Sequence, residues 1–172
     1  MATLIKDRRI VADNWLLSRR GPDGELPELP SRGEVIVPLG LWQAHRGDFL
    51  ARSGALGVWL DSHEDPAAIA SDLDRINLVA VNFPKFGDGR GYSIARLLRE
   101  RHCYKGELRA IGEVLRDQLL FMAQCGFDAF ALREDQDPDE ALAAFDEFSE
   151  AYQTSFVQPV PLYRRRLPAS RP

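Results

Sequence analysis

The sequence predicts an α/β protein of about five βα units with a mostly parallel sheet, preceded by a short N-terminal hairpin. Short apolar runs alternate with helical patterns at intervals of roughly 20 to 30 residues, which suits βα units. The apolar runs are rich in Val, Leu and Ala and show little polar alternation, so we expect strands that are buried on both faces. These observations fit both an open three-layer sheet and a partial barrel.

The elements follow from hydrophobic periodicity along the 172-residue chain. Residues 1–15 read as a hairpin, because two apolar pairs flank the charged turn Asp7-Arg8-Arg9. Residues 16–33 follow as a connector rich in proline and glycine. The predicted strands are Glu34–Val37, Leu56–Leu60, Leu78–Phe83, Leu108–Ile111 and Ala129–Leu132. Helices are predicted at Trp42–Ser53, Pro66–Asp74, Tyr92–His102, Glu113–Cys125 and Pro138–Gln153.

Capping residues agree with these boundaries. Asp65-Pro66 and Asp137-Pro138 place a proline in the first helical position after an aspartate cap. The organisation is therefore an N-terminal hairpin and connector over 1–33, a single α/β domain over 34–158, and a basic tail over 159–172 that we expect to be disordered.

Composition limits the class of protein. With 45% hydrophobic and 28% charged residues, the chain is typical of one soluble globular domain. No apolar run reaches the roughly 20 residues that span a bilayer, and charges at residues 6–9 interrupt any signal peptide, so we expect no membrane association and a cytoplasmic location. The net charge of −4 argues against nucleic-acid binding. Residues 83–112, however, carry seven basic and three acidic side chains, a local charge of +4.

The candidate site is the glycine-rich segment 83–93, which lies between a predicted strand and a predicted helix. Glycine allows a backbone to approach a ligand closely, and a helix N-terminus presents free N–H groups to an anion. We therefore expect this basic loop and its neighbours to bind an oxyanion or another ligand. The candidate binding residues are Asn82, Lys85, Gly89, Arg90, Gly91, Tyr92, Ser93, Arg109 and Arg116. Asp88 and Glu113 are the candidate acid or base residues if the protein is an enzyme.

Structural interpretations of the same residues stay open. The loop fits a tight turn without a ligand, and Arg96, Arg99 and Arg101 fit a solvated helix face. The sequence 87–91 lacks the Gly-Lys-Ser/Thr ending of a phosphate loop and the spacing of a dinucleotide fingerprint. The two cysteines and three histidines share no metal-ligand spacing, so no metal site and no cofactor is evident.

Three strings identify a resemblance to a known family: residues 80–86, residues 88–99, and residues 108–118. They are similar to the bacterial domain-of-unknown-function family 934, and the likeness covers about Leu4 to Tyr152. Members of that family are commonly described as oxidoreductases of sulfite reduction, mainly because their genes lie beside those for sulfate-assimilation enzymes. The resemblance thus implies the pathway of sulfate assimilation.

Together, the residues and the resemblance give three hypotheses. The first is an accessory protein of sulfite reduction that binds an oxyanion or a partner enzyme, such as sulfite reductase, at the basic loop. The second is an enzyme of the same pathway that acts on a sulfur oxyanion or a nucleotide sulfate. The third is a structural or interaction domain without a ligand.

Overall fold

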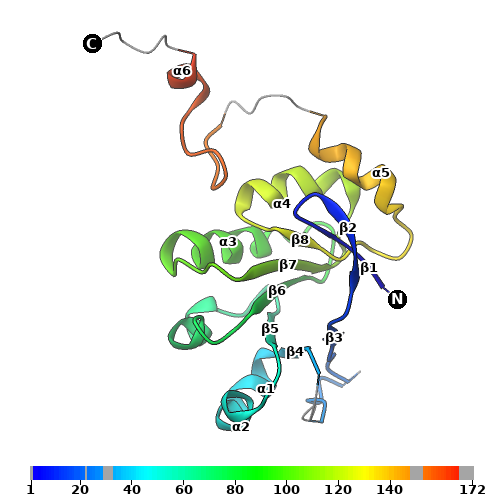
Figure 1. Cartoon of the computed structure of the whole chain (residues 1–172), viewed down its shortest axis with the longest axis vertical. Coiled ribbons are helices and arrows are strands. Elements are labelled where there is room, and N and C mark those ends of the chain that lie inside the picture. Colours follow the sequence, from blue (N-terminus) through cyan, green and yellow to red (C-terminus); the bar gives the residue numbers. More distant parts are fainter. Residues whose placement is uncertain (1, 22, 29–32, 148–152, 167–172) are drawn as a thin grey trace.

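The computed structural model describes residues 2–21, 23–28, 33–147 and 153–166, and its eight strands form one sheet (Figure 1). The strands are β1 (Ala2–Lys6), β2 (Arg9–Asp13), β3 (Leu16–Leu17), β4 (Val35–Pro38), β5 (Leu56–Leu60), β6 (Leu78–Phe83), β7 (Glu107–Gly112) and β8 (Ala129–Phe130). Their spatial order is β2-β1-β8-β7-β6-β5-β4-β3. Strands β3 to β8 run parallel, and the hairpin β1–β2 joins β8 in antiparallel orientation.

Short helices connect the strands. They are α1 (Leu39–Ala44), α2 (Arg46–Ala51), the 3-10 helix η1 (Pro66–Asp72), α3 (Arg90–Arg96), the π-helical turn η2 (Leu97–Arg101), the 3-10 turn η3 (Arg116–Gln118), α4 (Leu119–Cys125), α5 (Pro138–Leu142), the 3-10 turn η4 (Ala143–Phe145) and α6 (Leu162–Arg165). Among the described residues, no helix has the length and apolar character needed to cross a bilayer. The mixed α/β class is confirmed.

The predicted count of five βα units is not confirmed. The two-residue strand β3 adds a parallel strand from the region predicted to be a connector, and the element between β5 and β6 is a 3-10 helix. The helix predicted at 113–125 begins only at Arg116, and the one predicted at 42–53 begins at Leu39 and is divided at His45. Of the helix predicted at 138–153, residues 148–152 lie outside the described part of the chain, as do residues 167–172 of the predicted tail.

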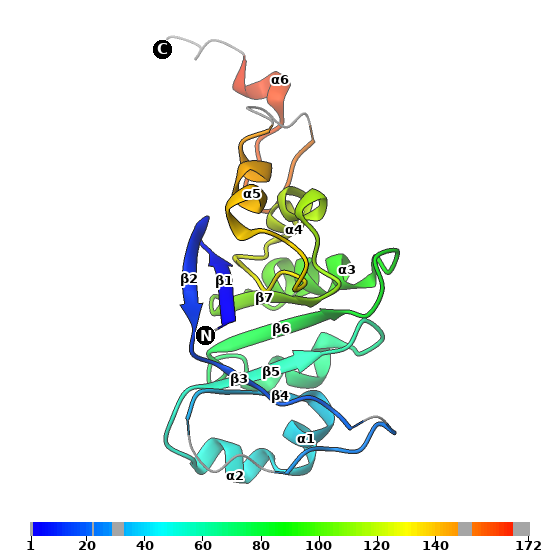
Figure 2. The same cartoon turned by 90° about the vertical axis from the view of Figure 1, so that its right-hand side faces the viewer.

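The sheet curls into a half-barrel (Figure 2). Strands β2 and β3 lie at its two opposite edges, yet only Asn14 and Trp15 separate them in the sequence. Asp13 and Leu16 are three residues apart, so at most about 11 Å separates their Cα atoms, and the two edges must approach each other. This connection resolves the choice that the sequence left open, in favour of the partial barrel.

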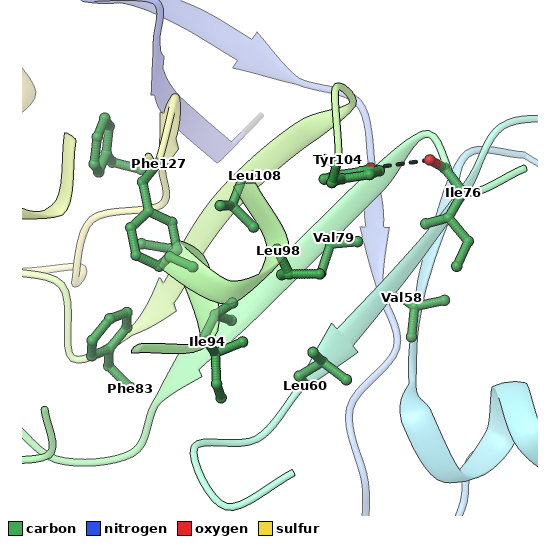
Figure 3. Close-up of a cluster of buried hydrophobic side chains, with 14 of the residues drawn as sticks. Val58, Leu60, Ile76, Val79, Phe83, Ile94, Leu98, Tyr104, Leu108 and Phe127 are labelled. Carbon is green, nitrogen blue, oxygen red and sulfur yellow. Dashed lines mark hydrogen bonds between the residues drawn. The ribbon is translucent and has the colours of Figure 1, made fainter. Parts of the chain in front are cut away.

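The main core fills the space between the convex face of the sheet and the helices. Figure 3 shows Ile94 of α3 and Leu98 of η2 lying over apolar side chains of β5, β6 and β7. The Tyr104 hydroxyl donates a hydrogen bond of 3.0 Å to the Ile76 carbonyl beside this cluster. Each fully buried large apolar side chain contributes roughly 1.5–3 kcal/mol, so this layer supplies much of the stability of the fold.

The concave face carries a second, smaller core. Its buried members are Ile36, Trp59, Leu78, Ala80 and Ile111, and Trp15, Leu17 and Ala131 pack against them. Residues of both faces alternate along each strand, as β-strand geometry requires. The connection from β2 to β3 therefore covers the inside of the half-barrel.

A buried charge cluster fixes this curl. Arg109 of β7 is only 2% exposed and bonds to two carboxylates, with 3.0 Å from Nη1 to Asp13 Oδ2 and 2.8 Å from Nε to Glu107 Oε1. Lys6 Nζ lies 2.6 Å from the other oxygen of Glu107. Because Asp13 ends β2 and Arg109 lies on β7, the cluster ties the hairpin across the concave face.

Candidate functional site

A polar groove lies at the mouth of the half-barrel, where the parallel strands reach their carboxyl ends. Two adjoining cavities of about 250 and 320 Å³ share Leu17, Arg19 and Ile111. The first is completed by Arg20, Trp59, Asp61 and Asn82, and the second by Gly112, Glu113, Ala131, Leu132, Arg133 and Glu134. The carboxyl edge is where barrels and open α/β sheets bind ligands, so we define these residues as the mouth groove.

Two adjacent arginines, which follow β3 after the single residue Ser18, line the mouth groove. Arg20 lies over the Trp59 ring, 5.2 Å from the ring centre, and its Nη2 donates a hydrogen bond of 2.6 Å to Glu64. Arg20 Nε is buried and finds no acceptor among the described residues. Arg19 is exposed, and its side chain has no hydrogen-bond or ion-pair partner within the described ranges. The groove therefore contains cationic groups that can still accept an anion.

Asn82 of β6 faces these arginines and is held by its neighbours. Its Nδ2 donates a hydrogen bond of 3.2 Å to Asp61, which also accepts one of 2.8 Å from the Ser62 backbone. On the other side, Gly112 has a φ of +93°, and a Cβ there would lie 2.6 Å from Asn82 Oδ1. Only glycine fits this position. The amide therefore has a fixed orientation, with one N–H left to donate.

In the glycine-rich loop, the side chain of Arg90 is paired with a carboxylate of the same loop, that of Asp88. Asp88 accepts hydrogen bonds from Arg90 Nε (2.9 Å), Arg90 Nη2 (2.6 Å) and the Ser62 hydroxyl (2.7 Å), as well as from the Arg90 backbone N–H (3.2 Å). These bonds, foremost those from the Arg90 side chain, hold the pKa of Asp88 far below its usual range and raise the pKa of Arg90. Asp88 thus occupies the place at the start of α3 where the sequence predicted an external oxyanion.

The remaining predicted residues of this segment either pack against the core or are exposed. Gly91 is buried, and a Cβ there would lie 2.7 Å from the Phe83 ring, so it allows α3 to lie directly on β6. Tyr92 packs between Phe83 and Phe121, and burial raises its pKa. The other three, Lys85, Gly89 and Ser93, are exposed.

The predicted basic residues of later strands and helices are bound to other parts of the protein. Arg116 donates a hydrogen bond of 3.0 Å to the Glu140 carbonyl and pairs with Glu147, so it faces α5. Arg109 belongs to the buried cluster under the hairpin. Glu113 lines the groove but is paired with Arg133 at 2.8 Å, whose pKa is raised by its bonds to Asp135 and Glu113.

The structure therefore brings together only part of the predicted site. Asn82 and Glu113 lie in the mouth groove, and Asp88 and Arg90 lie beside it, joined to Asp61 through Ser62. Sequence reasoning missed Arg19 and Arg20, which it assigned to a connector. The apolar pair Leu16-Leu17, one residue before the two arginines, is the local sign of a short strand there, but it gives no indication of a cavity. Within the described ranges, no group of three His, Cys, Asp or Glu side chains is placed to hold a metal ion.

The fold and the groove define an α/β half-barrel protein with a polar, partly cationic groove at the mouth of the barrel. The family "Bacterial protein of unknown function (DUF934)" matches residues 57–163, which is more than half of the chain. The protein belongs to this family, so the resemblance predicted from its sequence is confirmed. No curated protein and no solved structure matches the chain.

Proposed function

We propose that this protein is an accessory component of reductive sulfate assimilation, acting in the cytoplasm, that binds a small sulfur oxyanion in the mouth groove. The observation that carries the proposal is Arg19, a cation without a partner among the described residues, next to Arg20 with its buried, unbonded Nε. Guanidinium groups suit sulfate, sulfite and nucleotide sulfates because their planar fork matches paired oxygens. The sulfur chemistry rests on the family resemblance.

The geometry supports binding more than catalysis at the residues that the sequence favoured as acid or base. A carboxylate whose pKa is held low by several hydrogen-bond donors is a weak proton acceptor, and its protonated form is scarce at neutral pH. Asp88 is such a carboxylate, because hydrogen bonds from Arg90 and Ser62 lower its pKa. Glu113 is engaged by Arg133. Both carboxylates therefore favour the accessory role, in which the protein presents the oxyanion to a partner such as sulfite reductase.

One observation favours the alternative, an enzyme acting on the same anion. Asp61 and Asn82 line the same cavity as Arg19, so a carboxylate and an amide would lie beside the bound group. Replacing Asp61 by Asn would abolish turnover in an enzyme, yet would leave anion binding intact or stronger, since a negative charge is removed from the cavity.

The test is thermal unfolding of the full chain against sulfite, sulfate, phosphate and adenosine 5′-phosphosulfate, with sodium chloride at matched ionic strength as the control for screening. A ligand at 100 times its dissociation constant stabilises the fold by about 2.7 kcal/mol, or roughly 5–10 °C in a domain of this size. We expect one of the sulfur oxyanions to raise the melting temperature, and the Arg19→Ala variant to lose that shift.

The Arg90→Ala variant is the matched control, since it removes the same charge from the glycine-rich loop. We expect it to keep the shift. If the rise in melting temperature is kept in Arg19→Ala but lost in Arg90→Ala, the oxyanion binds at the glycine-rich loop and not in the mouth groove. If no oxyanion changes the melting temperature, the binding proposal is wrong.

A further inference from the structure

The C-terminal arm, residues 153–166, carries apolar side chains that stay largely exposed among the described residues. Val157 is 62% exposed, Tyr163 60% and Val160 47%. Figures 1 and 2 both show the arm and α6 standing away from the sheet and its helices. The arm is attached at its start, where the Phe156 backbone N–H donates a hydrogen bond of 3.0 Å to the Gln124 carbonyl. A segment that is attached to the fold and exposes several apolar side chains is typical of an interaction site.

The arm is also basic. It contains Arg164, Arg165 and Arg166 and no acidic residue. The guanidinium of Arg164 lies 6.0 Å from the ring centre of its own neighbour Tyr163. Neither Arg164 nor Arg166 pairs with a carboxylate among the described residues. The family match extends to Tyr163, so the apolar part of the arm belongs to the family unit.

The complementary surface lies on the same chain. The acidic segment, residues 134–147, carries seven exposed carboxylates and no lysine or arginine: Glu134, Asp135, Asp137, Asp139, Glu140, Asp146 and Glu147. Four of them are engaged, by Arg133, by the N-terminus of α5, by Arg8 and by Arg116. The side chains of Glu134, Asp139 and Glu140 have no partner within the described ranges.

An exposed aromatic ring lies on a helix that neighbours the acidic segment and packs at 4.9 Å against Tyr92 of α3. Phe121 of α4 is 53% exposed. Helix α4 packs beside η4, and η3, which leads into α4, packs beside α5. An apolar side chain on α4 and, on the neighbouring segment, three carboxylates without a partner in the described part of the chain are therefore exposed, which is the combination that an arm with apolar and basic residues requires.

We propose that the protein forms a two-fold dimer in which the arm of each copy binds the acidic segment and α4 of the other. Arg164 and Arg166 meet carboxylates such as Asp139 and Glu140, and Tyr163 packs near Phe121. Because each copy both gives an arm and receives one, the arrangement closes at two copies. A second copy is the favoured occupant because both charged surfaces are encoded in this one sequence. The proposal is independent of the oxyanion.

The experiment is sedimentation of the full chain over a range of concentrations, at low and at high salt. We expect a dimer at low salt that dissociates as salt rises, because screening weakens exposed charge contacts. Two double variants carry the test: Arg164→Glu with Arg166→Glu, and Asp139→Lys with Glu140→Lys. Each alone places like charges at the contact and raises the dimer dissociation constant at least about tenfold.

Mixing the two double variants gives the decisive result. In the mixed dimer, the acidic arm of one chain meets the new lysines of the other, and the basic arm meets unchanged carboxylates, so we expect the dimer to return. Arg101→Glu with Lys105→Glu, which changes the net charge by the same amount elsewhere on the surface, should leave the dimer unchanged. A chain that stays monomeric at every concentration overturns the proposal. The proposal is also wrong if the arm variants leave the dimer dissociation constant unchanged, or if mixing the two double variants fails to restore the dimer. Binding of the arm to a different acidic protein or to anionic vesicles would then be the alternative.

Discussion

Removing the Arg109 guanidinium should destabilise the protein by about 3 kcal/mol. Arg109→Met keeps most of the side-chain volume but leaves Asp13 and Glu107 without their main partner in a buried site; their side chains are only 14% and 8% exposed. Breaking a buried ion pair by removing one member costs about 3–5 kcal/mol, because the remaining charge is buried and unpaired. Glu107 keeps Lys6 at 2.6 Å, which places the expected cost at the lower end.

Equilibrium unfolding in urea at neutral pH measures this cost, and its slope reports whether the unfolding remains a single transition. Arg96→Met is the matched control, since Arg96 pairs with Glu100 on the surface, where both side chains are about half exposed, and an exposed pair four residues apart contributes only about 0.3–0.5 kcal/mol. A loss below about 1 kcal/mol for Arg109→Met, or a loss equal to that of the control, would refute the role given to the buried cluster.

Two further predictions test the loop and an isolated ion pair. Gly91→Ala places a Cβ 2.7 Å from the Phe83 ring and should lower the free energy of unfolding by about 1–3 kcal/mol. Gly87→Ala is the control, because a Cβ there meets nothing within 4 Å, and it should change the urea midpoint little. Equal effects of the two variants would contradict the close packing of α3 on β6. Hydrogen bonds from Arg46 lower the pKa of Asp72, so this pair stabilises the fold above the ordinary aspartate value of about 3.9, and its contribution is lost as the pH falls through the lower folded-state pKa. The free energy of unfolding of wild type should therefore exceed that of Asp72→Asn at pH 7, and the gap should narrow below pH 4; a constant gap would contradict the assignment.

Much of the fold could be predicted because its main signals are local. The apolar runs of β5 and β6 match the structure residue for residue, since strands buried on both faces leave a nearly continuous apolar signal, broken in β6 only by Asn82. The hairpin was predicted from its charged turn, where Asp7 and Arg8 both adopt positive φ. Strand β3 was not predicted, because two residues carry no period and its partner β4 lies 19 positions further along the chain. The curl of the sheet depends on that strand.

The candidate site could be predicted only in its location at the carboxyl edge. The sequence shows that Asp88 lies two residues from Arg90, but not that Ser62, 26 positions earlier, completes a set of donors around that carboxylate. Conversely, nothing near Arg19 in the sequence indicates a cavity, because the walls come from β5, β6 and β7. Whether a charged side chain is satisfied or available is decided by contacts between distant segments.

The contrast between Arg90 and Arg19 links the fold to the proposed function. Both are exposed arginines near the carboxyl edge of the sheet. Arg90 forms an ion pair with Asp88, whereas Arg19 has no partner among the described residues. Arg19 reaches the groove because the chain crosses from β2 to β3, and that crossing begins at Asp13, one of the carboxylates held by Arg109. The buried cluster therefore positions Arg19 although Arg109 itself does not line the mouth groove. If this connection is correct, Arg109→Met should weaken the oxyanion-induced rise in melting temperature even where the protein remains folded, while Arg96→Met should leave it unchanged.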